Sequence, residues 1–197
     1  MTEKRRHGKE LENAIFDATI DILNDDGLDG VTFSKVAARV KTSRPVIYRR
    51  WDSPFSLALE AIRNKIRQDN HGHMQDITLS GQNLSEDLSQ VLQRYMVVMN
   101  TFSRYYVSLL LAGTNSDDTS VLDDVFEHGN QENIKTMTVI LNRAIDRDEI
   151  KEDKFSNETK LLPFEWLRYH LFTESKVSDE QLKTFIKCVL VPVYTQK

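Results

Sequence analysis

The stretch TFSKVAARVKTSRPVIYRRW, residues 32–51, decides the fold, because it predicts two short helices joined by a hydroxyl-rich turn. The second helix begins at Arg44-Pro45 and ends at Arg49-Arg50. A short helix that enters a groove of DNA needs basic or hydroxyl groups at its start and a second helix to brace it. The stretch supplies both and therefore indicates sequence-directed DNA binding.

Charge is concentrated around the same stretch. Between Gly30 and Arg67 the chain has nine basic and two acidic residues, although its net charge is −4. A basic block on an otherwise acidic protein is typical of a dedicated phosphate-binding head. Chance clustering on a solvated helix face stays open as the alternative.

Composition bounds the class of protein. With 40% hydrophobic and 28% charged residues, the chain is typical of soluble globular proteins. No run of about 18 apolar residues predicts a membrane span, and residues 1–10 do not lead into the apolar core of a signal peptide. The only cysteine, Cys188, cannot form an internal disulfide. We therefore expect a cytoplasmic protein.

Helix signals surround the basic stretch. Apolar spacing predicts a first helix over residues 10–24, after which Gly27 takes a left-handed cap conformation. Thr32 is a good N-cap for the second helix, and Thr42 or Ser43 for the third. A fourth helix follows from Ser53-Pro54.

Beyond a polar linker over residues 69–83, the remaining pattern is helical throughout. The predicted segments are 84–102, 103–112, 119–147, a helix from Ser156 that Pro163 kinks, and a final apolar helix over 182–193. No strand-like alternation of useful length occurs. We predict an all-α fold of about nine helices, with a small basic head over residues 1–52 and a helical body over residues 53–197.

From Leu11 to Leu59 the chain resembles the TetR/AcrR family of bacterial transcriptional regulators. The segments ATIDILNDDGLDGVTFSKVAARV and TSRPVIYRRW look like the DNA-binding domain of that family, and the Pro, Tyr and Trp offsets in the second are specific. The body resembles the family in helix number, in length and in its LPFEWLRYHLF segment.

The resemblance implies a three-helix helix-turn-helix domain followed by a helical ligand-binding and dimerisation domain. A homodimer would present two recognition helices, roughly 34 to 36 Å apart, to a pseudo-palindromic double-stranded operator. The DNA-contacting residues that we expect are Thr32, Ser34, Lys41, Arg44, Pro45, Val46, Tyr48, Arg49, Arg5 and Arg6.

The roles of these residues differ with their chemistry. The resemblance places Arg44 in the major groove, where its fork matches guanine, and Val46 offers a methyl surface to thymine. Tyr48 would reach a phosphate, as would Lys41 and Arg49, and such contacts position the protein without reading sequence. The basic cluster that contains Arg5 and Arg6 forms either a minor-groove arm or a disordered tail.

Two positions depart from the family pattern. Lys41 stands where members usually have glycine, so either it adopts an unusual backbone angle or the turn differs. Pro54 stands where they usually have lysine, which removes one expected phosphate contact.

Other chemistry is weakly indicated. His71 and His73 suit a metal by spacing, but no further ligands support them. Cys188 is either a redox sensor or, as we favour, a small buried residue at a dimer seam. No hydrolase, zinc-protease or phosphate-loop motif occurs. We expect neither metal nor cofactor nor enzymatic activity.

The predicted function is a repressor that a small apolar or amphipathic molecule releases from DNA. A ligandless regulator or adaptor and a small helical enzyme remain as alternatives. Glu165, Arg168 and His170 line a ligand pocket near the proline or lie at a surface or interface. The candidate ligand-binding residues, which first of all form core, are Tyr95, Met99, Phe102, Phe126, Met137, Trp166 and His170.

The final helix has an apolar face too wide to bury within one small bundle, which predicts a dimer interface. Its residues are Leu182, Phe185, Ile186, Val189, Leu190 and Val193.

Overall fold

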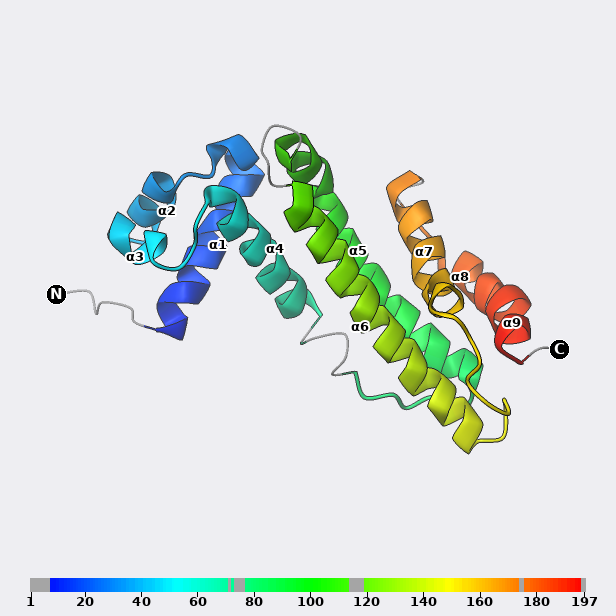
Figure 1. The fold of residues 1–197 in the computed structure, drawn as a ribbon. Helices are drawn as coiled ribbons and strands as arrows, with labels where there is room; N and C mark the ends of the chain where they lie inside the picture. Colours follow the sequence, from blue (N-terminus) through cyan, green and yellow to red (C-terminus); the bar gives the residue numbers. More distant parts are fainter. Residues whose placement is uncertain (1–7, 71, 73–76, 114–118, 174–175, 196–197) are drawn as a thin grey trace. The chain divides into compact units, whose positions relative to one another are not determined.

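The computed structural model describes residues 8–70, 72, 77–113, 119–173 and 176–195, and of residues 106–113 and 119–125 it describes the backbone alone. Every regular element in these ranges is helical (Figure 1), which confirms the predicted all-α fold. Within the same ranges no helix has the length and apolar character that a membrane crossing requires.

The first helix, α1 (Lys9–Asp26), ends at Gly27, whose N–H donates to the Leu23 carbonyl. Gly27 has the positive φ that we predicted, 70°, but its ψ of −173° is extended and not left-handed helical. The 3₁₀ turn η1 (Leu28–Gly30) follows. The chain then reaches α2 (Phe33–Arg39), where the Thr32 hydroxyl accepts from the Lys35 N–H at 3.2 Å and confirms the predicted cap.

A tight turn joins α2 to α3 (Arg44–Tyr48). Lys41 has φ 56°, so this chain keeps the backbone angle for which glycine is preferred. The Thr42 N–H donates to the Ala37 carbonyl and the Lys41 N–H to the Ala38 carbonyl, a Schellman arrangement that satisfies the last carbonyls of α2. Ser43 is the N-cap residue of α3, but its side chain forms no capping bond.

Replacing Lys41 with glycine is expected to stabilise the protein. A side chain in the left-handed region costs roughly 1 kcal/mol, so Lys41→Gly should raise the free energy of unfolding by up to about 1 kcal/mol. Urea denaturation measures the change. Lys41→Ala is the matched control, because it removes the charge and keeps the strained angle; equal stability of the two variants would contradict the explanation.

The fourth helix, α4 (Pro54–Asp69), packs on α1 through apolar side chains. Phe16 of α1 is buried with Leu57, Ala61 and Ile62 of α4. This packing groups α4 with the N-terminal helices, whereas the sequence analysis assigned residues 53–197 to the body. The first compact unit comprises residues 1–69 and 104–117, and the second comprises 70–103 and 118–197.

The second unit contains α5 (Leu84–Gly113) up to Ser103, followed by α6 (Thr119–Asp146). The two helices lie side by side and antiparallel (Figure 1), since Asp87 meets Arg143 while Phe102 meets Phe126. The predicted break at residue 103 was wrong, because α5 is continuous. No glycine or proline interrupts it there, and the Ser103 hydroxyl donates to the Asn100 carbonyl of the same helix.

The rest of the second unit is α7 (Asn157–Thr173), α8 (Asp179–Phe185), the π-helical segment η3 (Ile186–Leu190) and α9 (Val191–Thr195). Pro163 lies inside α7 and is buried. A capping box between Ser178 and Gln181 starts α8. The wider π turn precedes Pro192, whose ring offers no N–H to the preceding turn.

Candidate nucleic-acid interface and ligand cleft

The helix α3 has one exposed and one buried side. Arg44 and Pro45 lie on the same side of α3 as Tyr48, which follows them by four and three residues. All three are exposed, and 59% of Tyr48 is accessible. Ile47 on the opposite side is completely buried and Trp51 nearly so. The outer side of α3 is therefore free for a ligand, while the inner side fixes its position.

The end of α3 is tied to its neighbours by Trp51. The indole N–H donates to Glu60 Oε2 of α4 at 2.7 Å, and the ring meets Phe16 edge to face at 5.6 Å. Sequence reasoning did not identify Glu60 as this partner. The signal that was available is chemical, because a buried indole N–H requires an acceptor.

Tyr48 is held from one side. Its ring lies edge to face against Phe33 of α2, with centroids 4.7 Å apart, so the exposed phenol has a defined direction. Thr32 is exposed and Ser34 half-buried at the start of the same helix. The Thr32 oxygen accepts the capping bond, which leaves its O–H to donate elsewhere.

Acidic residues of α1 pair with part of the basic block. Lys35 lies 3.3 Å from Asp26, Arg39 lies 3.3 Å from Asp25, and Arg50 lies 3.7 Å from Glu12. These exposed pairs are weak and can exchange for phosphate.

Two arginines at the ends of α3 do not take part in those pairs. Arg44 and Arg49 form no ion pair with any residue that the structure describes. Lys41 is exposed and Val46 half-buried. Arg44 and Arg49 thus leave positive charge at both ends of α3 available to an anion.

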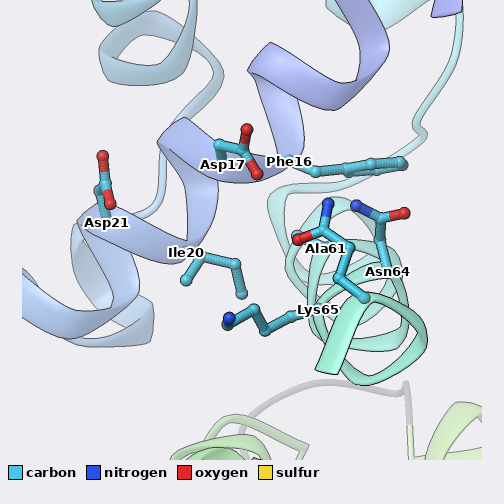
Figure 2. Close-up of a pocket in the computed structure, with 8 residues that line it drawn as sticks. Phe16, Asp17, Ile20, Asp21, Ala61, Asn64 and Lys65 are labelled. Carbon is cyan, nitrogen blue, oxygen red and sulfur yellow. The ribbon is translucent and has the colours of Figure 1, made fainter. Parts of the chain in front are cut away.

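A groove between α1 and α4 is lined mainly by acidic and apolar groups. It measures about 210 Å³, and Figure 2 shows the carboxylates of Asp17 and Asp21 on its α1 wall and Asn64 and Lys65 on its α4 wall. Lys65 is already paired with Asp69 at 2.7 Å. The groove is therefore acidic, and phosphate is repelled from it.

The second unit contains a cleft of about 130 Å³. Its walls come from α5, α6 and α7, and four of the seven predicted ligand residues lie together in it. The lining residues are Tyr95, Val98, Met99, Phe102, Phe126, Gly129, Glu132, Asn133 and Arg168.

The other three predicted ligand residues lie elsewhere. Met137 is completely buried as core. Trp166 stacks on Phe185 of α8 with ring centres 4.1 Å apart, and the His170 ring lies tilted against Trp166 at the same distance. Trp166 therefore contributes to the packing of α7 on α8. Helical spacing in the sequence did not show which side of α7 faces the cleft and which side faces α8.

Arg168 is the central polar group of the cleft. Its guanidinium lies 5.6 Å from the centre of the Phe126 ring, donates to Asn130 Oδ1 at 2.9 Å and pairs with Glu165 at 3.1 Å. Burial raises the pKa of the neighbouring Tyr95 hydroxyl, and the Arg168 charge opposes that rise. Tyr95 is therefore a neutral phenol on the cleft wall.

Burial changes the predicted dimer interface. Leu182, Phe185, Ile186 and Leu190 are buried within their own chain, so they are not available to a partner. The apolar face that stays exposed is therefore narrower than the sequence indicated, and Phe185, for example, stacks on Trp166 of α7. Exposed apolar groups that remain on α7, η3 and α9 are Tyr169, Val189 and Val193, and Cys188 beside them is also exposed.

Arg5 and Arg6, which we predicted to contact DNA, lie outside the described residues, as do His71 and His73. Within the described ranges no three His, Cys, Asp or Glu side chains gather in a way that suits a metal ion.

Comparison with known proteins identifies similar chains. Residues 15–61 match the family described as "Bacterial regulatory proteins, tetR family". The uncharacterized HTH-type transcriptional regulator Rv1556 of Mycobacterium tuberculosis is 26% identical over 192 residues, which are 94% of this chain and 88% of that protein.

Solved structures share the fold. FadR from Bacillus subtilis, in complex with stearoyl-CoA, has a TM-score of 0.57 at 16% identity and covers 92% of this chain and 96% of its own. A TetR-like transcriptional regulator from Rhodococcus sp. RHA1 has a TM-score of 0.50 at 12% identity, covering 98% and 100%. The likeness therefore extends beyond the helix-turn-helix to the second unit.

Proposed function

Because this chain belongs to the TetR family of bacterial regulatory proteins, we propose that it represses transcription by binding an operator and that a small molecule in the cleft releases it. The observation that carries the DNA-binding part is the exposed side of α3, with Arg44, Pro45 and Tyr48 outward and Ile47 buried. We assign it no enzymatic activity, since its relatives are regulators.

In this proposal the outer side of α3 enters the major groove. Arg44 reads guanine through two parallel hydrogen bonds, and Val46 contacts a thymine methyl. Tyr48, Lys41 and Arg49 bind phosphates, which fix the register. Thr32 and Ser34 approach the backbone from α2, and the arm containing Arg5 and Arg6 follows the adjacent minor groove.

The helical body responds to the ligand through α5. Met99 and Phe102 line the cleft, and Tyr105, one turn later on the same helix, donates to Asn24 of α1 at 3.1 Å within the first unit. A ligand that shifts α5 therefore alters a contact of the DNA-binding helices. Release requires only that the ligand bind the state that cannot bind DNA more tightly than the DNA-binding state, by a few kcal/mol.

The proposed dimer uses the apolar groups that stay exposed on η3 and α9. We expect the double variant Val189→Glu with Val193→Glu to be monomeric and to bind operator poorly, because two buried carboxylates would face each other across the interface. Light scattering measures the mass. Val97→Glu is the matched control, since Val97 on α5 is 40% exposed and Val189 is 39% exposed; a dimeric double variant would place the interface elsewhere.

The test of the proposed function is a selection of bound duplexes from a random pool with the full-length protein. A pseudo-palindromic sequence should be enriched, and its two half-sites should be spaced by about one helical turn. Recovery of unrelated duplexes at moderate salt would reject the proposal.

A further inference from the structure

We infer that the effector is a compact, uncharged, mostly apolar molecule of about one aromatic ring, with one hydrogen-bond acceptor that meets Arg168 Nε. The inference rests on the proposed function and names the ligand class of its cleft. Size, an unsatisfied donor and the local charges each restrict that class.

Size is the first restriction. The cleft bounded by described residues measures about 130 Å³, and a cavity of roughly 150 Å³ accommodates benzene. The apolar part of the wall comes from Val98, Met99, Phe102 and Phe126. Aromatic edges and a thioether suit a flat ring, and the space that the described residues bound is about the size of one ring.

An unsatisfied donor is the second restriction. Arg168 uses its Nη1 for Glu165 and its Nη2 for Asn130. Its Nε is buried and has no hydrogen-bond partner among the described residues. Native proteins rarely leave a buried N–H without an acceptor, so an acceptor atom of the ligand is the natural partner.

Charge is the third restriction. Glu165, which does not line the cleft, already compensates the Arg168 guanidinium. Glu132 places a carboxylate on the cleft wall itself. A carboxylate or phosphate on the ligand would be desolvated beside Glu132 without an uncompensated cation to meet it. A carbonyl or ether oxygen accepts the Nε–H without that penalty.

Calorimetric titration of the full-length protein with four probes tests the inference: acetophenone, ethylbenzene, benzoate and stearoyl-CoA. Acetophenone is expected to bind most tightly, and stearoyl-CoA should not displace it. Arg168→Met should reduce the preference for acetophenone over ethylbenzene about tenfold or more, because a hydrogen bond to a charged donor is lost.

Gly129→Leu serves as a second variant that does not disturb Arg168. A Cβ at Gly129 meets no atom within 4 Å, and leucine suits a helix better than glycine, so we expect this variant to fold, which circular dichroism checks. Its side chain should fill the cleft and abolish acetophenone binding, while Gly129→Ala should bind more weakly than the natural protein but measurably.

Tighter binding of benzoate or stearoyl-CoA than of acetophenone, an acetophenone preference unchanged by Arg168→Met, or no binding of any probe would each overturn the inference. Operator binding by the ligand-free protein is measured in parallel. If the ligand-free protein binds the operator but the probes give one of these contrary results, only the ligand class is rejected. If the ligand-free protein does not bind the operator, the proposed function itself fails.

Discussion

Replacing Arg44 with alanine is expected to weaken binding to the selected operator by about 1 to 3 kcal/mol, roughly 5- to 150-fold. Arg44 is expected to read one base pair in each half-site. The affinity should fall only for duplexes that keep the preferred base pair at that position. Arg44 is exposed at the start of α3 and is paired with no described residue, so its guanidinium is available for a base edge. Competition titrations with single-base variants of the operator measure the effect.

Tyr48→Phe is the matched comparison for that variant. It keeps the ring that packs on Phe33 at 4.7 Å and removes only the hydroxyl. A phosphate contact carries no sequence information, so affinity should fall alike for all duplexes. If both variants lost the same affinity on every sequence, the division of roles between Arg44 and Tyr48 would be refuted.

Replacing Asp87 with alanine is expected to lower the free energy of unfolding by about 3 to 5 kcal/mol. The Asp87 side chain is completely buried, and it accepts from Arg143 Nε at 2.9 Å and lies 3.0 Å from Arg147. Its removal leaves two guanidinium groups, each less than a third exposed, without their shared carboxylate. Urea denaturation followed by circular dichroism measures the loss.

The control for Asp87 is Glu152→Ala. Glu152 pairs with Lys154 where both side chains are more than half exposed, so its removal should change stability by less than about 1 kcal/mol. Similar losses in the two variants would show that burial does not set the strength of these pairs.

Local signals made the helix-turn-helix predictable from the sequence. Thr32 caps α2 as expected, Pro45 sits in the first turn of α3, and Gly27 has the predicted positive φ. Each of these depends on residues close in the chain. Lys41 shows the limit of such reasoning, because the sequence left two alternatives and the structure selects the strained angle.

The body was harder to predict, because its residues are positioned by contacts between distant segments. Tyr95, Met99, Phe102 and Phe126 gather in one cleft. Trp166 instead stacks on Phe185, which only the packing of α7 on α8 determines. Four residues that the sequence assigned to the dimer interface are likewise buried within the chain.

The outer side of α3 is expected to lie in the major groove, and DNA cleavage by a reagent attached to that side tests this placement most directly. Cys188 is the only cysteine, so in a Cys188→Ser background an iron chelate can be attached at Pro45→Cys, with Asp179→Cys of α8 as the control position. If the outer side of α3 lies in the major groove of each half-site, the chelate at position 45 cuts the operator at two places about 10 base pairs apart. Cutting from position 179 with none from position 45 would contradict it.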